Sequence, residues 1–466
     1  MALVAMTPRR KAASLSEQFS YTHMHTVIDT GRRADNNQGE VMKQVDATLL
    51  TIEDLKALVY GACFCASGGG GPISMALTFL QKMQQPVPLV SLEQLDHSQL
   101  ALVPADMGSP DAALKGLGYT APVNACKTLR AYLQQQHQSV GYLMPIEIGA
   151  VNSLIPFYLA EQLGSGLAVI DADPSGRSVP QLNETLLDLS QQAICPAAVA
   201  SDTHTGSDNS TPPALCRYSG EPYHSELITE PLSATELEDK ARQIVSGPEY
   251  QQVGGLSCYP LSAEWLATAQ SSLVTGSLHK AVKIGHQLLK NTDASQLSAT
   301  LSANQIEHYL LFRGTLTDIQ NHTVGGFDLG KLVFEGAAPA DGDKANNVDQ
   351  GSSSTAKPAF WVYYKNESLI AWDVQQQQPR VLAPDCINLR LVETHGDKTA
   401  GSPLSTADIA TGQLCEIWGT ACAPAMRNSQ LVARFQQDIA QLSSQFPELQ
   451  SYDLGYRTLS DLNATS

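Results

Sequence analysis

The chain has 466 residues, with 46 acidic side chains against 29 basic ones and a formal net charge of −17. This length exceeds what one ordinary hydrophobic core needs, so we expect about two or three domains. The acidic balance argues against nucleic acid or an anionic membrane surface as the main partner, because both require a basic face. A small-molecule substrate or a protein partner is favoured, and homo-oligomerisation stays open.

The nine cysteines have neither the density nor the spacing of a disulfide scaffold. Cys63 and Cys65 form a C-x-C pair, and no second pair with zinc-ribbon spacing accompanies it. We interpret the cysteines as reduced thiols and expect a cytoplasmic location. No apolar run has the length of a membrane-spanning helix. Residues 1–47 lack the long apolar core of a secretory signal, so a disordered tail is expected, with a transit peptide as the alternative.

Residues 48–300 alternate between helical and strand patterns. Helical spacing over 52–59 follows Thr51, a typical N-cap residue. Further helices are expected at 73–83, 124–135 and 152–163, and strands at 87–90, 100–105, 142–148 and 167–171. This alternation predicts an α/β domain with a mostly parallel sheet. Ligands bind beyond the carboxyl ends of the strands in such sheets, so the loops at those ends are the expected site.

Beyond residue 300 the pattern changes to short strands separated by turns. Strands are expected at 309–317, 331–334, 359–364, 368–374, 386–393 and 413–418, which predicts a compact antiparallel barrel or sandwich over 301–425. The segment 337–357 is rich in Ala, Gly, Asp, Asn and Ser, and we expect a disordered insertion there. Residues 426–466 are expected to form a C-terminal helix and tail. Residues 263–289 read as mostly helical.

Four consecutive glycines, Gly68, Gly69, Gly70 and Gly71, precede Pro72 and a predicted helix. Glycine permits positive φ angles and lets a ligand approach backbone N–H groups closely. The N-terminus of the next helix would favour a carboxylate, phosphate or oxyanion. The pattern is neither G-x-G-x-x-G nor a Walker loop, so nucleotide binding is not supported. These glycines are therefore candidate substrate-binding residues, and a turn that only permits tight packing is an equally good interpretation.

Three acidic residues near predicted strand ends are candidates for catalysis. Glu147 ends an apolar strand, where partial desolvation would raise its pKa and suit a general acid or base. The alternative is that it caps a helix or pairs with Arg177. Asp171 and Asp173 would share one face of a strand and could activate water or hold a divalent cation, with Arg177 orienting a substrate carboxylate. A salt-bridged turn is the alternative.

A metal site is the remaining hypothesis from the residues themselves. Asp173, Asp202 and His204 carry ligand types suited to a divalent ion such as zinc, although a solvated loop histidine is the simpler interpretation of His204. Asp106 and Asn152, in other strand-end loops, complete the predicted substrate-binding set. The chain contains neither a G-x-S-x-G elbow nor an H-E-x-x-H zinc helix.

Several stretches, in the same order along the chain, resemble the S-methyl thiohydantoin desulfurase domain family. They begin with GACFCASGGGGP (61–72), PADMGSP (104–110), IEIGAVNS (146–153) and DADPSGRSVP (171–180), and continue at 275–278 with 284–285, 323–327, 365–371 and 383–387. The segment 452–456 resembles the end of the family pattern. The resemblance implies an N-terminal three-layer α/β domain joined to a β-barrel-like domain.

The resemblance also implies an activity: hydrolytic removal of sulfur from a thiohydantoin-type ring, or cleavage of a related cyclic amide. Two carboxylates of the family pattern are missing here, since Gly71 precedes Pro72 directly and Gln181 follows Pro180. Residues 65–67 also depart from the family's usual Leu-Gly-Thr. These differences favour an alternative, a non-catalytic ligand-binding or accessory subunit of a hydantoinase or oxoprolinase-type complex. A hydantoinase-type protein is accordingly the expected protein partner.

Overall fold

The computed structural model describes residues 47–108, 118–164, 166–203, 216–217, 220–324, 327–336 and 357–464. The predicted N-terminal tail, apart from Ala47, and the predicted insertion, apart from Lys357, lie outside these ranges, as does His204. Within the ranges no helix is both long enough and apolar enough to cross a membrane. None of the nine cysteines, all of which are described, forms a disulfide.

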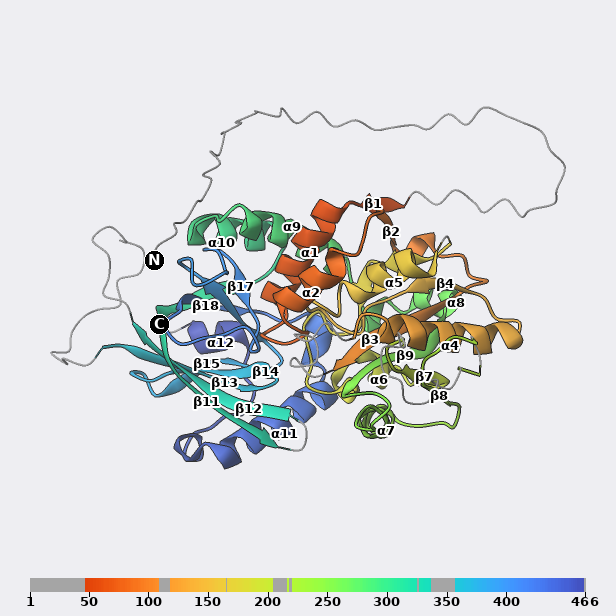
Figure 1. Ribbon diagram of the computed structural model, residues 1–466. Coiled ribbons are helices and arrows are strands. Elements are labelled where there is room, and N and C mark those ends of the chain that lie inside the picture. The colour runs from red at the N-terminus through yellow and green to blue at the C-terminus, as the bar shows by residue number, and fades with distance from the viewer. Residues whose placement is uncertain are drawn as a thin grey trace, which may run out of the picture. The chain divides into compact units, whose positions relative to one another are not determined.

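The N-terminal part is built on an eight-stranded mixed sheet (Figure 1). Its central strands β2, β5, β4 and β3 are parallel, as predicted, and antiparallel strands extend it on both sides. In spatial order the strands are β1 (Thr48–Leu50), β2 (Val87–Val90), β5 (Ala168–Ile170), β4 (Val140–Leu143), β3 (Leu100–Gly108), β9 (Val253–Ser262), β7 (Ala197–Ala200) and β8 (Ser225–Ile228).

Helices cover both faces of this sheet because its central strands are apolar on both sides. Leu102 and Leu143 pack into one core, while their neighbours Ala101, Val103 and Met144 pack into the other. The first core is closed by α1 (Ile52–Cys65), α2 (Ile73–Leu80), α4 (Ala121–Gln135), α5 (Ile155–Leu163) and α9 (Ser277–Leu289). The second is closed by α6 (Leu186–Leu189), α7 (Ala234–Val245) and α8 (Ala263–Thr268). The three-layer α/β arrangement is therefore present.

The C-terminal part contains a second eight-stranded sheet, antiparallel throughout. No strand pairing among the described residues closes this sheet, so the predicted barrel is supported only as an antiparallel sheet. Helix α11 (Ser429–Gln445) packs on the second sheet through Phe435 and Leu442. Helix α10 (Ala294–Ala303) comes directly before the first strand of that sheet in the chain. In spatial order the strands are β15 (Gln378–Leu382), β14 (Glu367–Asp373), β13 (Ala359–Lys365), β12 (Phe327–Gly336), β11 (His308–Val324), β18 (Leu414–Thr420), β16 (Cys386–Leu391) and β17 (Pro403–Leu404).

Two predicted elements differ from the structure in ways that matter for the site. Helix α1 continues through Gly61 to Cys65, so the glycine-rich loop begins later than the sequence indicates. The prediction that 263–289 is mostly helical is wrong in its middle. Strand β10 (Val274–Thr275) pairs there with β6 (Ala172–Asp173), and Gly276 adopts a left-handed conformation (φ 70°) before α9 begins. A left-handed residue cannot continue an α-helix.

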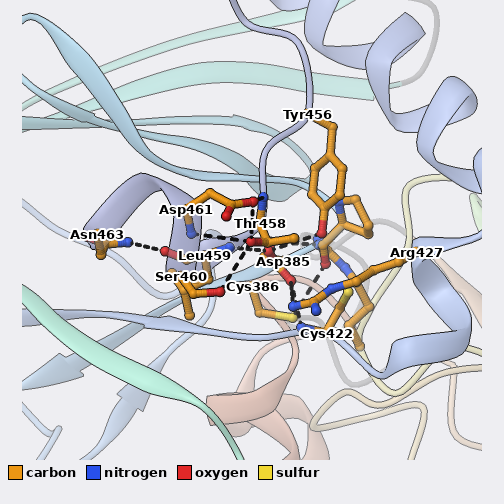
Figure 2. A network of polar contacts seen from close by, with 12 residues as sticks. Asp385, Cys386, Cys422, Arg427, Tyr456, Thr458, Leu459, Ser460, Asp461 and Asn463 are labelled. Atoms are coloured by element: carbon orange, nitrogen blue, oxygen red, sulfur yellow. Dashed lines mark hydrogen bonds and ion pairs between the residues drawn. The ribbon is translucent and has the colours of Figure 1, made fainter. Parts of the chain in front are cut away.

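Asp385 anchors the C-terminal segment to the second sheet (Figure 2). Its buried carboxylate accepts hydrogen bonds from the N–H groups of Cys422 and Leu459, at 2.9 and 2.8 Å. It also accepts from the Arg427 guanidinium at 3.3 Å and from the Tyr456 hydroxyl at 3.2 Å. The short helix α12 (Leu459–Asn463) therefore starts at a fixed point beside strand β16.

Candidate functional site

The glycine-rich loop lies between the two sheets. Ser67 donates a hydrogen bond from Oγ to the Ser368 carbonyl at 2.9 Å and accepts one from the Ile387 N–H at 3.0 Å. On the other side, the Gly70 carbonyl accepts from the Val151 N–H at 2.9 Å, and a Cβ at Gly70 would lie 2.3 Å from the Cα of Gly149. The loop thus joins the loop after β4 to the second sheet through hydrogen bonds to main-chain groups on both sides, which fits the packing interpretation of these glycines.

The helix N-terminus after the glycines already holds an anion. Asp408, from the C-terminal part, accepts a hydrogen bond from the Ile73 N–H at 3.0 Å, at the first residue of α2. A carboxylate at this position satisfies an unpaired N–H group and interacts favourably with the helix dipole. The predicted anion-binding position is therefore occupied by the protein's own side chain.

Two of the predicted carboxylates also cap helices. Asp171 accepts hydrogen bonds from the N–H groups of Leu278 and His279 at the start of α9, both at 3.1 Å. Asp202 accepts from the N–H groups of Thr120 and Ala121 at the start of α4, at 2.8 and 2.9 Å. Each cap lies more than 80 residues from its helix in sequence. Local patterns could not reveal either pairing.

Arg177 is fully buried, and its hydrogen bonds go to main-chain carbonyl oxygens. Nε donates to Ser178 at 2.8 Å, and Nη1 donates to Pro384 at 2.7 Å and to Asp385 at 3.2 Å. The guanidinium also lies over the Phe435 ring of α11, 5.0 Å from its centroid. This arrangement ties the two parts of the chain together and leaves the predicted role in substrate orientation without support from these contacts.

A pair of buried carboxyl groups meets at Ser178, between the two sheets. Glu147, 6% exposed, accepts hydrogen bonds from Asn152 Nδ2 at 2.7 Å and from the Val179 N–H at 2.8 Å. Glu367, 4% exposed, accepts from Ser178 Oγ at 2.8 Å. We call Glu147 and Glu367 the carboxyl pair. It joins the loop after β4 to the first residue of β14.

The surroundings of the carboxyl pair raise the pKa values of both members toward neutral pH. Burial raises the pKa of Glu147 to about 7, against the opposing effects of the hydrogen bonds from Val179 and Asn152 and of the nearby Ser178 hydroxyl. Burial, and then the charge of Glu147, raise the pKa of Glu367 to about 8. Because the two groups interact, the pair takes up and releases protons as a unit. Near pH 7 we therefore expect one member of the pair to be ionised and the other to be protonated.

Asp173 lies close enough to the carboxyl pair for its charge to raise the pKa of Glu147. Its Oδ1 accepts from the N–H groups of Ser175 and Gly176, at 2.8 and 2.5 Å. Its Oδ2 and the Oε2 of Glu367 are buried and have no hydrogen-bond partner in the described ranges. Burial raises the pKa of Asp173. For Asp173 the nearby Ser277 hydroxyl can supply the donor, whereas Glu367 Oε2 needs a donor such as a water molecule or a ligand.

Asp106, on β3, lies away from the carboxyl pair and beside Asp202, which caps α4. Burial of its carboxyl group, and then the charge of Asp202, raise its pKa to about 8. A surface cavity of about 790 Å³ runs along the second half of α4, and its lining includes Lys127, Arg130 and His137. None of the predicted site residues lines this cavity.

The predicted metal set gains no support from the described residues. Among them, no group of three or more His, Cys, Asp and Glu side chains could hold a metal ion. Asp202 uses its carboxylate oxygens to cap α4. His204 lies outside the described ranges, so its part in the prediction is untested.

Glu367 is the site residue that the sequence did not single out. It stands within the stretch 365–371, which contributes to the family resemblance, but nothing local marks it as functional. A left-handed Asn366 (φ 55°) makes a tight turn and directs Glu367 toward Ser178, which is 189 residues away in sequence. Its role depends on that long-range contact.

Comparisons with known proteins agree with this architecture. The family described as S-Me-THD-like, N-terminal domain, matches residues 53–207, and S-Me-THD-like, C-terminal domain, matches residues 233–435. The crystal structure of a protein from Chromobacterium violaceum, a Northeast Structural Genomics Consortium target, superposes with a TM-score of 0.68 at 25% sequence identity. The match covers 89% of this chain and 100% of that one. No curated protein matches the chain.

Proposed function

The chain belongs to the S-Me-THD-like family, and on that premise we propose that it is a hydrolase of a thiohydantoin-like or hydantoin-like ring. For an S-methyl thiohydantoin, water attacks the ring carbon that bears sulfur. A C–O bond forms, the C–S bond breaks, and the products are a ring carbonyl and methanethiol. For a hydantoin, the corresponding bond broken is the ring C–N bond.

The carboxyl pair is the observation that carries this proposal. Hydrolysis needs a base that removes a proton from water and an acid that gives one to the leaving group. With pKa values of about 7 and about 8, Glu147 and Glu367 provide one of each near neutral pH. In our proposal the ionised member accepts the water proton, and the protonated member donates to the leaving sulfur or nitrogen.

Neighbouring groups support these roles. Asn152 Nδ2 holds one oxygen of Glu147 and the Val179 N–H holds the other, so the carboxyl plane of Glu147 is fixed. Gly69 has no side chain, and a Cβ there would lie 2.0 Å from Glu367 Oε1. The loop can therefore approach Glu367 only because this residue is glycine. Glu367 Oε2 is buried and has no hydrogen-bond partner within the described ranges, so in our proposal it accepts from a substrate N–H.

The test uses the purified full chain with a panel of S-methyl thiohydantoins, thiohydantoins and hydantoins, with and without added zinc or manganese. Release of methanethiol, or ring opening, is measured. Turnover by the native chain is expected to fall about 100-fold or more in Glu147→Gln and in Glu367→Gln. The exposed control Glu249→Gln should keep native activity. The proposal is rejected if the native chain turns over no compound, or if either active-site variant retains native activity.

The alternative, a non-catalytic accessory subunit, is favoured by one observation. The glycine loop and the start of α2 are engaged by Gly149 and Asp408, so these two predicted anion-binding features are already occupied within the chain. An accessory subunit would bind a hydantoin-type ligand without turnover and would co-purify with a hydantoinase-type partner. Whether the chain is a hydrolase or an accessory subunit, substitution of Glu147 or Glu367 is the first experiment.

A further inference from the structure

A second group of buried ionisable side chains lies near Glu367. Glu184 ends the 3₁₀ turn η2 (Leu182–Glu184), Asp438 is on α11, and Lys365 ends β13. Their exposed fractions are 1%, 4% and 3%. Lys365 Nζ lies 2.7 Å from Asp438 Oδ1, and also over the Phe327 ring, 4.3 Å from its centroid. The group connects η2 of the N-terminal part with α11 and the second sheet.

Two carboxyl oxygens in this group have no hydrogen-bond partner among the residues that the structure describes. Glu184 Oε2 accepts from the Gln181 N–H at 3.1 Å, and Asp438 Oδ1 accepts from Lys365. Glu184 Oε1 and Asp438 Oδ2 are buried and have no hydrogen-bond partner within the described ranges. Helix α11, which carries Asp438, packs against η2, which ends at Glu184. After burial, Asp438 is the main cause of the raised pKa of Glu184. Two acceptors side by side are satisfied when one of them carries a proton and donates it to the other.

The surrounding cations do not remove the need for that proton. On α7, Arg242 pairs with Glu238 at 2.7 Å, and on α11 Arg434 pairs with Asp188 at 2.7 Å. Lys365 pairs with Asp438 and also lowers the pKa of Glu184, but Glu367 on β14 acts in the opposite direction. Glu184 therefore forms no ion pair with a cation in the part of the chain that is described. A buried carboxyl group in this position stays neutral.

We propose that Glu184 and Asp438 form a second carboxyl pair, which shares one proton across the interface and, through Lys365, positions the turn that carries Glu367. The Glu184 carboxylic acid donates from Oε1 to Asp438 Oδ2, while Asp438 Oδ1 binds the Lys365 ammonium. Both residues are positioning residues, since they act on Glu367 through the turn. Only their effect on turnover rests on the proposed function; the shared proton does not.

The path from this pair to Glu367 is short. Lys365 and Glu367 are directly paired across the β13–β14 turn, and only Asn366 separates them in sequence. Directly opposed residues of an antiparallel pair project to the same face, so fixing Lys365 restricts Glu367. Helix α11 is itself fixed one turn earlier, where Phe435 lies under the Arg177 guanidinium. Release of Asp438 from Lys365 would therefore loosen the turn while Arg177 still held the helix.

The test compares Glu184→Gln, which keeps an N–H donor toward Asp438, with Glu184→Ala, which removes it. In infrared difference spectra of the full chain at pH 7, Glu184→Gln should lose one C=O band of a protonated carboxyl group. The exposed control Glu249→Gln should not lose it. In urea unfolding at pH 7, the midpoint should stay near native for Glu184→Gln and fall clearly for Glu184→Ala.

Two further outcomes decide the proposal. If turnover is found, its pH profile should shift in Glu184→Ala and be restored in Glu184→Gln. The proposal is overturned if the infrared band is unchanged in Glu184→Gln, or if the two variants unfold at the same midpoint. Because the spectra and the unfolding need no substrate, failure of the proposed function would leave this test intact.

Discussion

Gly61 of α1 and Gly285 of α9 face each other where the two helices cross. A Cβ at Gly61 would lie 1.7 Å from the carbonyl oxygen of Ala281, and a Cβ at Gly285 would lie 1.7 Å from that of Ala57. The helices are therefore in backbone contact at this point. The crossing fixes the end of α1, from which the glycine loop continues, relative to the start of α9, which Asp171 caps.

We expect Gly285→Ala to destabilise the fold strongly. The added methyl group meets backbone atoms, which cannot rotate away, so the helices must separate, at a cost of about 3 kcal/mol or more. Urea unfolding measures the change. Gly141→Ala in β4 is the control, because the atoms nearest its Cβ belong to the Gln99 side chain, at 3.1 Å or more, and not to backbone. A loss of less than about 1 kcal/mol in Gly285→Ala would show that the helices are not in backbone contact.

The stability of the protein should fall as the pH rises from about 4.5 to about 8. Glu147 and Glu367 have pKa values raised to about 7 and about 8, so the folded chain binds more protons than the unfolded chain across this range. The stabilising contribution is complete below the unfolded pKa and is lost as the pH passes the folded values.

The size of this effect is on the order of 3 kcal/mol for each group. Unfolding free energies measured from pH 4.5 to pH 9 give the slope directly. Glu147→Gln, which cannot ionise, should have a visibly shallower slope, while Glu249→Gln should keep the native one. Equal slopes in the native chain and Glu147→Gln would mean that Glu147 is ionised in the folded state at all these pH values.

Gly69→Ala should disrupt the carboxyl pair directly. Its Cβ would lie 2.0 Å from Glu367 Oε1 and 2.5 Å from Ser178 Oγ, so the hydrogen bond between those atoms must break or shift. The φ angle of Gly69 is not in the left-handed range, so the effect would come from the contact and not from backbone strain. We expect turnover to fall at least 10-fold, about 1.4 kcal/mol in the activation barrier. Unchanged kinetics would exclude close approach of the loop to Glu367.

Arg177→Lys should destabilise the protein without a specific effect on substrate affinity. Lysine cannot reproduce the planar fork that bonds to the carbonyls of Ser178, Pro384 and Asp385. The loss of these buried, charge-assisted bonds is expected to cost about 3 kcal/mol. Unfolding midpoints and KM values separate the two roles. A large rise in KM at native stability would restore the predicted role of Arg177 in binding substrate.

Asp385→Ala should release the C-terminal segment. The substitution leaves the N–H groups of Cys422 and Leu459 without their acceptor and frees Arg427 and Tyr456. Limited proteolysis should then cleave near residues 450–460 faster than in the native chain. Tyr456→Phe, which removes one of the four contacts, should cost only about 1 kcal/mol and serves as the graded control.

The sequence by itself determined the order of the elements from α1 to β5, and the family. Apolar runs predicted β2 exactly where it lies in the chain, and β3, β4 and β5 near their observed positions, because strands buried on both faces need continuous apolar residues. The Thr51 cap of α1 is also local, since Thr51 and Asp54 form a reciprocal capping box. The resemblance of several ordered motifs was confirmed by matches over most of the chain.

Only the tertiary structure decided what the acidic residues do. Asp171, Asp202 and Asp408 each cap a helix far away in sequence, while Glu147 meets Glu367 through Ser178. The physical reason is that desolvation and hydrogen bonding set the state of a carboxylate, and both depend on which distant segments pack around it. The same residue type can therefore cap a helix or hold a proton, and the local sequence does not distinguish these roles.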